Sequence, residues 1–344
     1  MRKKDKAMLN VGIIGNGSIA GAHKAAYKRL QEQGLVQVAA FCDVRPDRLV
    51  GEAMDVFTDA RTYTDAAEML KSETGKLDYV DICVPTYLHA EIAIAAMEAG
   101  FDVLSEKPMA RTVEQAERMV EVSRKTGKRL MIAYCNRFAT AARMIKDLID
   151  SRKYGRVISA EFHRNGGSDA ALGWNDWFHD FSLSGSATLD LHIHDVDMIR
   201  WMFGMPKAVS MVGGNYMTRG GGYDVMATTY AYEDMYVTAH CDWFTAGNKF
   251  SGRFIRVNFE NGYICVDRTA ERKAFVEVPR HGDVIDHAEM NVFDAYYEEI
   301  RYFAQCIRDG KALDYNFPDE SVDSVRLVMA ELESADHGGM QVKL

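Results

Sequence analysis

The chain has 344 residues, which exceeds the size of a typical single domain and predicts two domains, each with a core of its own. With 47% hydrophobic and 26% charged residues, its composition is that of a folded globular protein and not of a disordered or fibrous one. The formal net charge of -9 argues against nucleic acid as the main partner, because no basic stripe is available to neutralise phosphates.

The N-terminus and the cysteines bear on where the chain functions. Residues 1–6 are basic, as at the start of a signal peptide, but only a short apolar stretch broken by glycines follows, and no later segment approaches a membrane span. The six cysteines are scattered and form no C-x-x-C pair or cysteine and histidine cluster, so neither a disulfide framework nor a structural zinc site is expected. We therefore expect a cytoplasmic protein with buried free thiols.

Residues 10–20 predict a strand, a tight turn and the start of a helix. Gly15 can take backbone angles closed to other residues, Gly17 removes the side chain that would keep a pyrophosphate away, and Ala20 lets helix and strand pack closely. The N-terminus of the helix then offers free N–H groups to phosphate. This pattern predicts a dinucleotide site at Gly15, Asn16, Gly17, Ser18 and Ile19.

A second β-rich run, residues 35–41, is followed by Asp43. A carboxylate at this point can accept hydrogen bonds from both hydroxyls of an adenosine ribose, and its charge repels a 2′-phosphate, which favours NAD. Arg45, two residues on, is long enough to reach such a phosphate instead, and a solvated turn before Pro46 would explain both residues without a ligand. We expect NAD as the cofactor and keep NADP as the alternative.

From residue 47 onward helices and strands alternate. Helices are expected at 47–57, 65–70, 90–99 and 112–126, and strands at 78–84, 101–104 and 129–134. The alternation predicts a doubly wound parallel sheet whose ligand lies beyond the C-terminal ends of the strands. The polar groups that follow these ends are therefore candidates for the cofactor or substrate site: Pro85, Thr86, His89, Glu106, Lys107, Asn136 and Arg137.

After about residue 150 the pattern changes to strands with few helices between them. Strands are expected at 156–163, 207–216, 224–232, 235–244, 253–260, 263–266 and 273–278, with a hairpin turn at Asn261-Gly262. This predicts a large, mostly antiparallel open sheet of about six strands, followed by helices at 292–308 and 318–334. We thus expect a Rossmann domain over residues 1–135 and an α+β substrate-binding and oligomerisation domain over 136–344, with the final helices able to pack back on the first domain.

Residues 190–197 bring three acidic residues and two histidines together. If residues 190–202 are helical, Asp190, His194 and Asp197 fall in one stripe, and His192 points roughly the other way. His192 and His194 are then poor joint ligands of one ion, so no metal site is expected. A carboxylate four residues before an imidazole can orient it for proton transfer, whereas a charged helix face with a satisfied histidine explains the segment without catalysis.

The glycine motif, residues 85–89, Glu106-Lys107-Pro108 and residues 190–197, in this order and ahead of a sheet domain, resemble the Gfo/Idh/MocA oxidoreductases, relatives of glucose-fructose oxidoreductase and inositol dehydrogenase. The resemblance covers nearly the whole chain. It implies that Lys107 hydrogen-bonds the reacting oxygen and contacts the nicotinamide ribose. It also implies that His194 accepts or donates the proton, that Asp190 binds or orients the substrate, and that the Lys107–Pro108 peptide bond is cis.

Two departures from the family concern the substrate pocket. His192 stands where family members often have glycine, and residues 184–187, Ser-Gly-Ser-Ala, are less rich in glycine than the usual lead into the catalytic helix. Trp177 either offers a flat face to a sugar or cyclitol or belongs to the core. Arg137 either holds an acidic substrate or is a surface arginine.

The expected activity is hydride transfer between a secondary alcohol of a sugar, sugar derivative or cyclitol and the nicotinamide of NAD(P). The histidine suits the proton step, and the lysine ammonium polarises the reacting oxygen. The alternative is a catalytically idle dinucleotide-binding sensor or regulatory protein, which has no need to retain Lys107, Asp190 and His194 together. An open sheet face would expose apolar surface in a monomer, so we expect a homodimer or homotetramer that acts on a small molecule and binds neither membrane nor nucleic acid.

Overall fold

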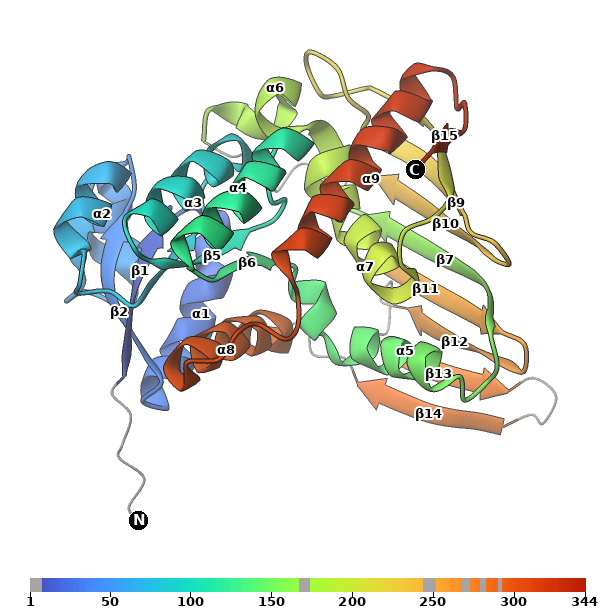
Figure 1. Cartoon of the computed structure of the whole chain (residues 1–344), viewed down its shortest axis with the longest axis horizontal. Helices are drawn as coiled ribbons and strands as arrows, with labels where there is room; N and C mark the ends of the chain where they lie inside the picture. Colours follow the sequence, from blue (N-terminus) through green and yellow to red (C-terminus); the bar gives the residue numbers. More distant parts are fainter. Residues whose placement is uncertain (1–7, 167–173, 244–251, 268–272, 279–282, 290–292) are drawn as a thin grey trace. The chain divides into compact units, whose positions relative to one another are not determined.

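The computed structural model describes residues 8–166, 174–243, 252–267, 273–278, 283–289 and 293–344, and it describes the backbone alone for those between 267 and 294. The basic residues 1–6 lie outside this part. The chain divides into two compact units (Figure 1). The first domain comprises residues 1–110, 114–135 and 293–321, and the second domain comprises 111–113, 136–292 and 322–344. No helix within the described ranges is long and apolar enough to cross a membrane.

The first domain is a parallel six-stranded sheet in the order β3-β2-β1-β4-β5-β6. Its strands are β1 Leu9–Ile14, β2 Val36–Cys42, β3 Arg61–Tyr63, β4 Tyr79–Ile82, β5 Asp102–Glu106 and β6 Leu130–Ala133. Every residue of β4, β5 and β6 is buried, as expected of parallel strands covered on both faces. The helices are α1 Ser18–Glu32, α2 Ala66–Glu73, α3 His89–Glu98, α4 Val113–Thr126 and α8 Phe293–Asp309. The predicted doubly wound Rossmann fold is confirmed.

Two details of this domain differ from the sequence-based expectation. The helix expected at 47–57 is a pair of 3₁₀ turns, Pro46–Leu49 and Gly51–Met54, because Val50 is extended between them and Asp55 has a φ of 52°. Strand β3 was not expected, since none of its three residues is buried and it carries no apolar run.

Helix α8 comes late in the chain but belongs to the first domain. It packs on α1, where the Tyr297 hydroxyl donates to Gln33 Oε1 at 2.8 Å and the Arg29 guanidinium lies 3.8 Å from the centre of the Tyr297 ring. A single domain boundary at residue 135 therefore does not describe residues 293–321, which belong to the first domain. The expectation that final helices could pack back on the first domain agrees with this position of α8.

The second domain is built on a mixed nine-stranded sheet in the order β14-β13-β12-β11-β7-β10-β9-β8-β15. Its strands are β7 Val157–Asn165, β8 Ala208–Gly214, β9 Val225–Ala231, β10 Tyr236–Asp242, β11 Gly252–Phe259, β12 Gly262–Asp267, β13 Lys273–Val278, β14 Asp283–Glu289 and β15 Val342–Lys343. The pair β7 and β10 is parallel and the other pairs are antiparallel, which confirms the mostly antiparallel sheet. Strands β14 and β15 were not expected, so the sheet is larger than predicted.

Helices cover one face of this sheet (Figure 1). They are α5 Thr140–Ser151, α7 Ile193–Phe203 and α9 Pro318–Asp336, and a short α6 Phe181–Ser184 lies between β7 and α7 in the chain. Strand β10 shows the two faces plainly, since Val237, Ala239 and Cys241 are buried and the residues between them are not. The hairpin between β11 and β12 turns at Glu260-Asn261, one residue earlier than predicted, because Phe259 pairs with Gly262.

All six cysteines are buried and free, as expected of residues within apolar runs. They lie on or next to strands and in α8, where each fills space in a core.

Candidate active site

The turn after β1 requires glycine at its first position. Gly15 has a φ of 93°, its N–H donates to Cys42 O at 2.7 Å, and a Cβ there would lie 2.5 Å from Cys83 O. Gly17 precedes the first residue of α1, and a Cβ on it would meet no heavy atom within 4 Å. The first turn of α1 contains no acidic residue, so the positive end of the helix is available to a phosphate.

Asn16, Ser18 and Ile19 complete the predicted phosphate-binding turn. Ser18 is exposed and Ile19 half-buried at the start of α1. The Asn16 side chain is 2% exposed, and its amide donates to Arg48 O and Ala53 O at 2.7 and 2.8 Å. Asn16 therefore ties the glycine turn to the segment after β2.

Asp43, directly after β2, is half-buried and fixed by the backbone on both sides. Its Oδ2 accepts the Asn16 N–H at 2.7 Å and its Oδ1 accepts the Arg45 N–H at 2.9 Å. A carboxylate offers about four lone-pair sites, so hydroxyl groups can still donate to it. The Arg45 guanidinium pairs with Asp47 at 2.6 Å.

The loops after β4 and β5 are joined by a histidine. His89, at the start of α3, is 1% exposed and its ring nitrogens lie 2.7 Å from Pro108 O and 2.8 Å from Val84 O. Burial lowers its pKa, while the two carbonyl oxygens that face its ring nitrogens act in the opposite direction. His89 therefore shapes the two loops, and we withdraw it as a direct cofactor ligand. In the same loop Pro85 is half-buried and Thr86 is buried.

Glu106 and Lys107 lie at the C-terminal end of β5. Glu106 is buried, Lys107 is half-buried, and the Lys107 N–H donates to Glu106 Oε2 at 3.0 Å. The Lys107–Pro108 peptide bond is cis, as the family resemblance implied.

In the second domain the segment 190–197 departs from a uniform helix. Residues 188–192 form a π-helical turn, and α7 begins at Ile193. The turn follows Gly185, with a φ of 86°, and Ser186, with a φ of 63°. Glycine is favoured at 185 by this positive φ and because a Cβ there would lie 2.6 Å from Leu189 Cβ. Because a π-turn shifts the phase of the side chains, the three-residue stripe predicted for this segment does not hold.

The polar residues of this segment fall into two groups. Asp195 pairs with Arg164 at 2.5 and 2.8 Å, and Asp197 pairs with Arg137 at 2.6 and 2.8 Å. These four side chains are at most 3% exposed. Asp190 and His194, by contrast, are half-buried and reach the surface of this domain.

His192 is fully buried on the other side of the turn. Its Nε2 lies 3.3 Å from Glu331 Oε2 and 3.3 Å from the Tyr230 hydroxyl, and Tyr230 donates to Glu331 Oε1 at 2.6 Å. His192 and His194 thus face different surroundings, as the sequence predicted. The contacts of His192 hold the π-turn to β9 and α9.

Three candidates for substrate binding have distinct surroundings. Arg137 is fully buried against Asp197, so we do not retain the predicted contact with an acidic substrate and assign it a structural role. Asn136 is 8% exposed, accepts a hydrogen bond from Arg253 Nη1 at 3.0 Å, and lines a small cavity of about 30 Å³ beside α7. Trp177 is half-buried and stacks on Phe178 at 4.1 Å between ring centres.

Arg164 and Arg253 were missed by the sequence analysis, and both line the cavity beside Asn136. Arg164 lies on β7, on the same face as the buried residues Phe162 and Ala160, and so takes a core position. A charged residue in the buried register of a strand is the signal that could have marked it, because such a charge needs a buried partner.

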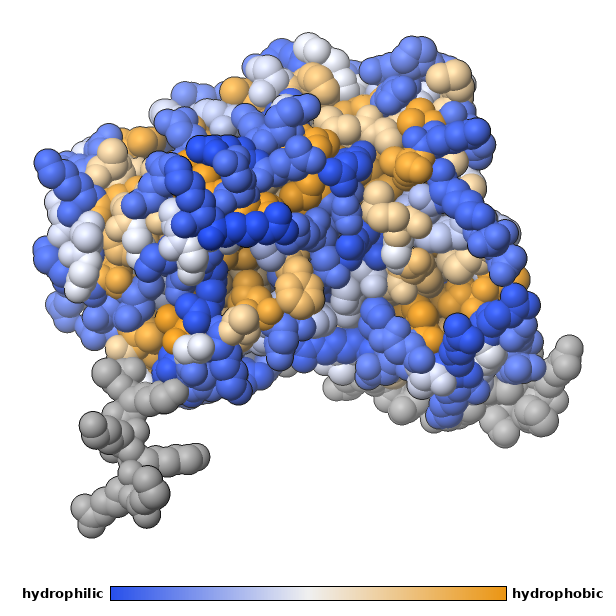
Figure 2. All heavy atoms as spheres, viewed as in Figure 1, coloured by the Kyte–Doolittle hydropathy of each residue, from blue (hydrophilic) through white to orange (hydrophobic). Residues whose placement is uncertain are grey.

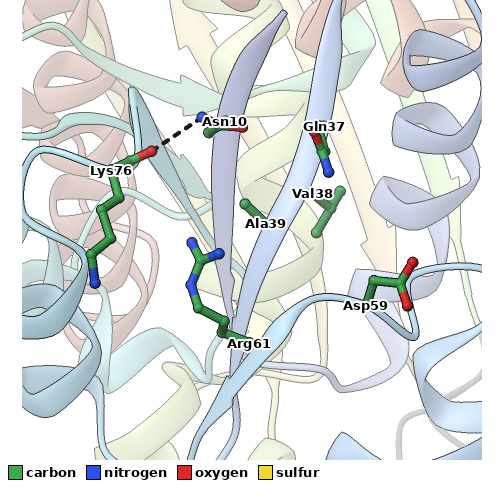
Figure 3. A pocket seen from close by; sticks show the side chains of 7 residues that line it. All are labelled: Asn10, Gln37, Val38, Ala39, Asp59, Arg61 and Lys76. Atoms are coloured by element: carbon green, nitrogen blue, oxygen red, sulfur yellow. Dashed lines mark hydrogen bonds between the residues drawn. The ribbon is translucent and has the colours of Figure 1, made fainter.

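A hollow of about 360 Å³ lies at a different edge of the first domain (Figure 3). Its lining residues come from β1, β2, β3 and the adjoining loops: Asn10, Gln37, Val38, Ala39, Asp59, Arg61 and Lys76. It adjoins the N-terminal parts of the strands, whereas ligands of open α/β sheets bind beyond the C-terminal ends. We therefore do not assign the cofactor to this hollow.

Comparison with known proteins covers both domains. Residues 9–134 match the model of the GFO_IDH_MocA oxidoreductase family, described as an NAD-binding Rossmann fold, and residues 142–265 match the GFO/IDH/MocA C-terminal domain. A levoglucosan dehydrogenase from Pseudarthrobacter phenanthrenivorans is 31% identical, over 64% of this chain and 58% of that protein. A D-glucoside 3-dehydrogenase from Escherichia coli is 29% identical, over 66% of this chain and 64% of that protein. The matches to both thus span less than two thirds of the relatives' own length.

Among solved structures, a levoglucosan dehydrogenase in complex with NADH and levoglucosan superimposes with a TM-score of 0.85 and 22% identity, over 97% of this chain and 99% of that one. This likeness extends the agreement in fold to the whole chain. The glycine turn, the Glu-Lys-Pro loop and the two domain matches lead to one conclusion: the chain belongs to the GFO/IDH/MocA family of oxidoreductases, and its first domain is the family's NAD-binding Rossmann fold.

Proposed function

We propose that this protein is an NAD-dependent dehydrogenase that oxidises a secondary alcohol of a sugar, sugar derivative or cyclitol, or reduces the corresponding ketone. The observation that carries the proposal is the division of polar residues around α7. Asp195 and Asp197 are committed to buried arginines, and His192 is buried with Glu331, whereas Asp190 and His194 reach the surface. The π-turn and the start of α7 thus place one carboxylate and one imidazole where a substrate can reach them.

The roles follow from the chemistry of alcohol oxidation. NAD supplies the hydride acceptor when it is bound, and the hydroxyl oxygen on the same carbon must lose its proton. His194 takes this proton because an imidazole titrates near neutral pH, and Asp190, four residues earlier, orients the substrate or the imidazole. Lys107 donates to the reacting oxygen and stabilises negative charge that develops there.

The first domain supports NAD in preference to NADP. Asp43 places a carboxylate directly after β2, and the guanidinium of Arg45, the group that could attract a 2′-phosphate, is engaged by Asp47. The backbone N–H groups of residues 17–19, at the start of α1, would hold the pyrophosphate, and the Asp43 carboxylate would accept the ribose hydroxyls.

The names of the relatives favour a carbohydrate substrate. The proteins matched above act on levoglucosan and a D-glucoside by name, and further relatives of 28–32% identity are inositol 2-dehydrogenases. Trp177 is half-buried and precedes residues 190–197 in the chain. It offers an aromatic face of the kind that sugars and cyclitols bind.

A catalytically idle dinucleotide-binding protein is the alternative. A screen of the purified protein separates the two functions. NAD, NADH, NADP and NADPH are tested by thermal shift, alone and with levoglucosan, methyl glucosides, myo-inositol and sugar acids, while absorbance at the nicotinamide band is followed. A ligand at a hundred times its dissociation constant stabilises the fold by about 2.7 kcal/mol, which is readily measured. Turnover with a polyol supports the dehydrogenase, and a dinucleotide shift without any turnover across the panel favours the idle protein.

We further propose that the protein forms a homo-oligomer through the face of the second-domain sheet opposite α5, α7 and α9. Val212 and Tyr236 on this face are 56% and 54% exposed. Polar residues lie on the same face of the sheet: Glu161, His163, Thr229, Thr238, His240 and Arg256. The face is thus mixed rather than purely apolar, and the side that carries the helices shows only separate apolar patches among hydrophilic residues (Figure 2). Sedimentation of the wild type and of a Val212→Glu/Tyr236→Glu variant tests this, with a monomeric variant as the expected result.

A further inference from the structure

A chain of buried polar side chains crosses the first domain behind the Glu-Lys-Pro loop. His23, on α1, lies between two carboxylates: its Nδ1 is 2.7 Å from Asp81 Oδ2 on β4, and its Nε2 is 2.9 Å from Glu106 Oε1 on β5. His23 and Asp81 are 0% exposed and Glu106 is 4% exposed. The Tyr27 hydroxyl donates to the same Asp81 oxygen at 2.9 Å.

His23 supplies the positive charge between the two carboxylates of this cluster. Burial alone would lower the pKa of His23, but the charge of Asp81 and its hydrogen bond raise the pKa well above the ordinary value. Burial would raise the pKa of Glu106, and the hydrogen bond and charge of His23 lower it below the ordinary value. Both directions indicate an imidazolium that donates one N–H to each carboxylate at neutral pH.

Other groups face the cluster without adding charge. Burial and the neighbouring Glu106 raise the pKa of Glu299, on α8, well above its ordinary value, which favours the uncharged carboxyl. Burial and Asp81 likewise raise the pKa of the Cys83 thiol to about 12, and the ring of Tyr296 packs 5.8 Å from that of His23. His23 is therefore the buried cation that Asp81 and Glu106 share.

A metal ion is a poorer explanation of the same residues. Within the described ranges His23, Asp81 and Cys83 offer ligand atoms close to one another. Two ligands bound to one tetrahedral zinc at about 2.0–2.1 Å stand roughly 3.4 Å apart, whereas His23 Nδ1 and Asp81 Oδ2 are separated by a hydrogen-bond length of 2.7 Å. The second ring nitrogen is occupied by Glu106, so the cluster is a hydrogen-bonded network.

Glu106 connects this network to Lys107. One carboxylate oxygen, Oε1, is held by His23, and the other, Oε2, accepts the backbone N–H of Lys107 at 3.0 Å. The Glu106 carboxylate has little freedom to turn, because its two oxygens are bound on opposite sides. The orientation of the Lys107 backbone, and with it the origin of the Lys107 side chain, follows from the position of this carboxylate.

We propose that His23 is a positioning residue for Lys107, acting through Glu106. The inference rests on the proposed function for its effect on catalysis, but the positioning itself is independent of any reaction. His23 touches neither substrate nor cofactor in this role. It holds the Glu106 carboxylate in place by a hydrogen bond, and this carboxylate in turn fixes the backbone of Lys107.

Hydrogen exchange at the Lys107 amide tests the positioning without activity. In the peptide spanning residues 104–109, Pro108 has no amide, and the amide of Lys107 is protected by Glu106 Oε2. We expect His23→Gln and Glu106→Gln to raise the exchange rate of this amide by about tenfold or more, since a lost charge-assisted hydrogen bond exposes the N–H. Tyr27→Phe is the matched control: it removes a hydrogen bond to Asp81 from the same helix, leaves Glu106 in place, and should leave this exchange rate unchanged.

The His23→Gln variant leaves two buried carboxylates without their cation, and it could fail to fold. The double variant His23→Gln/Asp81→Asn removes one charge of each sign and leaves Glu106 in place, so it keeps the net charge of the cluster while removing the support that His23 gives to Glu106. Fast exchange at the Lys107 amide in the double variant, together with a wild-type circular dichroism spectrum, supports the proposal. Wild-type exchange in this variant overturns it.

Kinetics with a polyol that the wild type turns over provide the second readout. We expect kcat to fall by about 10- to 100-fold in the His23 and Glu106 variants, the range that follows from a misplaced catalytic group, while the dissociation constant of NADH stays within about twofold. Tyr27→Phe should lower the melting temperature without this loss of kcat. Equal kcat values for Tyr27→Phe and His23→Gln would reduce His23 to a purely structural residue. If no polyol is turned over, the exchange experiment still decides the positioning, and only the proposed function fails.

Discussion

Arg137 and Asp197 form an ion pair that neither side chain shares with solvent: Nη2 lies 2.6 Å from Oδ1, Nε lies 2.8 Å from Oδ2, and the two side chains are 0% and 1% exposed. Asp197 is one turn beyond His194 on α7, so the pair anchors the helix that carries the candidate acid-base residue. Arg164 of β7 and Asp195 of α7 form a second buried ion pair that holds the same helix.

Removal of one member of the pair should be costly for stability. Arg137→Met leaves the Asp197 carboxylate buried without its cation, and we expect a loss of about 3–5 kcal/mol in the free energy of unfolding by urea. Arg137→Met/Asp197→Leu removes both charges and should lose less than the two single variants together. Lys146→Met, which breaks an exposed pair with Asp150 on α5, is the control and should cost about 0.3–0.5 kcal/mol. Additive losses in the double variant would argue against a coupled pair.

His194→Ala should abolish proton transfer while leaving the fold and the cofactor site intact. General acid-base catalysis contributes about 10²- to 10⁴-fold, so we expect kcat to fall by that factor and the affinity for NADH, measured by nicotinamide fluorescence, to stay nearly constant. His337→Ala is the matched control, because His337 is an exposed histidine near the C-terminus. If NADH binding collapsed together with turnover, the role of His194 would be structural.

Lys107→Ala should also reduce turnover without unfolding the protein. The loss of a donor to developing negative charge costs about 10²- to 10³-fold in kcat, and a half-buried lysine side chain contributes little to the core. The measurement is kcat beside the melting temperature, with Lys128→Ala, a half-buried lysine at the end of α4, as the comparison. A variant that no longer folds would remove the support for a catalytic lysine.

Asp43→Asn should shift the preference of the protein from NAD towards NADP. The change removes the charge that repels a 2′-phosphate and weakens the acceptor of the ribose hydroxyls. A hydrogen bond to a charged group is worth about 1.5–3 kcal/mol, so the ratio of the two dissociation constants should move by about tenfold or more. Calorimetry with both cofactors measures this ratio. Asp59→Asn, an exposed acid of the same domain, should leave it unchanged; an equal shift in both variants would mean that net charge, not the ribose site, sets the preference.

Glu299 should make the protein less stable as the pH rises. Its pKa is raised well above 4.5 by burial first and by Glu106 second, so the folded state holds a proton that the unfolded state releases. The stability that this proton provides is fully present below pH 4.5 and is lost as the pH rises towards the folded-state pKa, with a slope of about 1.4 kcal/mol per pH unit. Glu299→Gln carries no titratable proton, so its stability relative to the wild type should increase with pH over this range. Urea unfolding at a series of pH values measures the difference, and a difference that does not vary with pH would contradict the prediction.

Several parts of the site followed from local sequence. The glycine turn needs a positive φ at Gly15 and an approach to the backbone at Cys83 that only glycine permits, and both needs are written in the G-x-G pattern. The helix expected at 65–70 was equally visible, since Asp65 caps α2 by accepting the N–H of Glu68. The burial of Asp197 was not visible, because the helical spacing groups it with His194, and its partner Arg137 comes from a distant part of the chain.

The sequence by itself determined the alternation of strand and helix, the change to an antiparallel sheet, the nucleotide-binding turn and the family, since these depend on periodicity and on backbone angles within a few residues. Tertiary structure decided which charges are buried and which remain available. Arg137 is 60 positions from Asp197, and His23 is 83 positions from Glu106. A buried charge is stable only beside its partner, and no local pattern specifies a partner that the fold brings from so far along the chain.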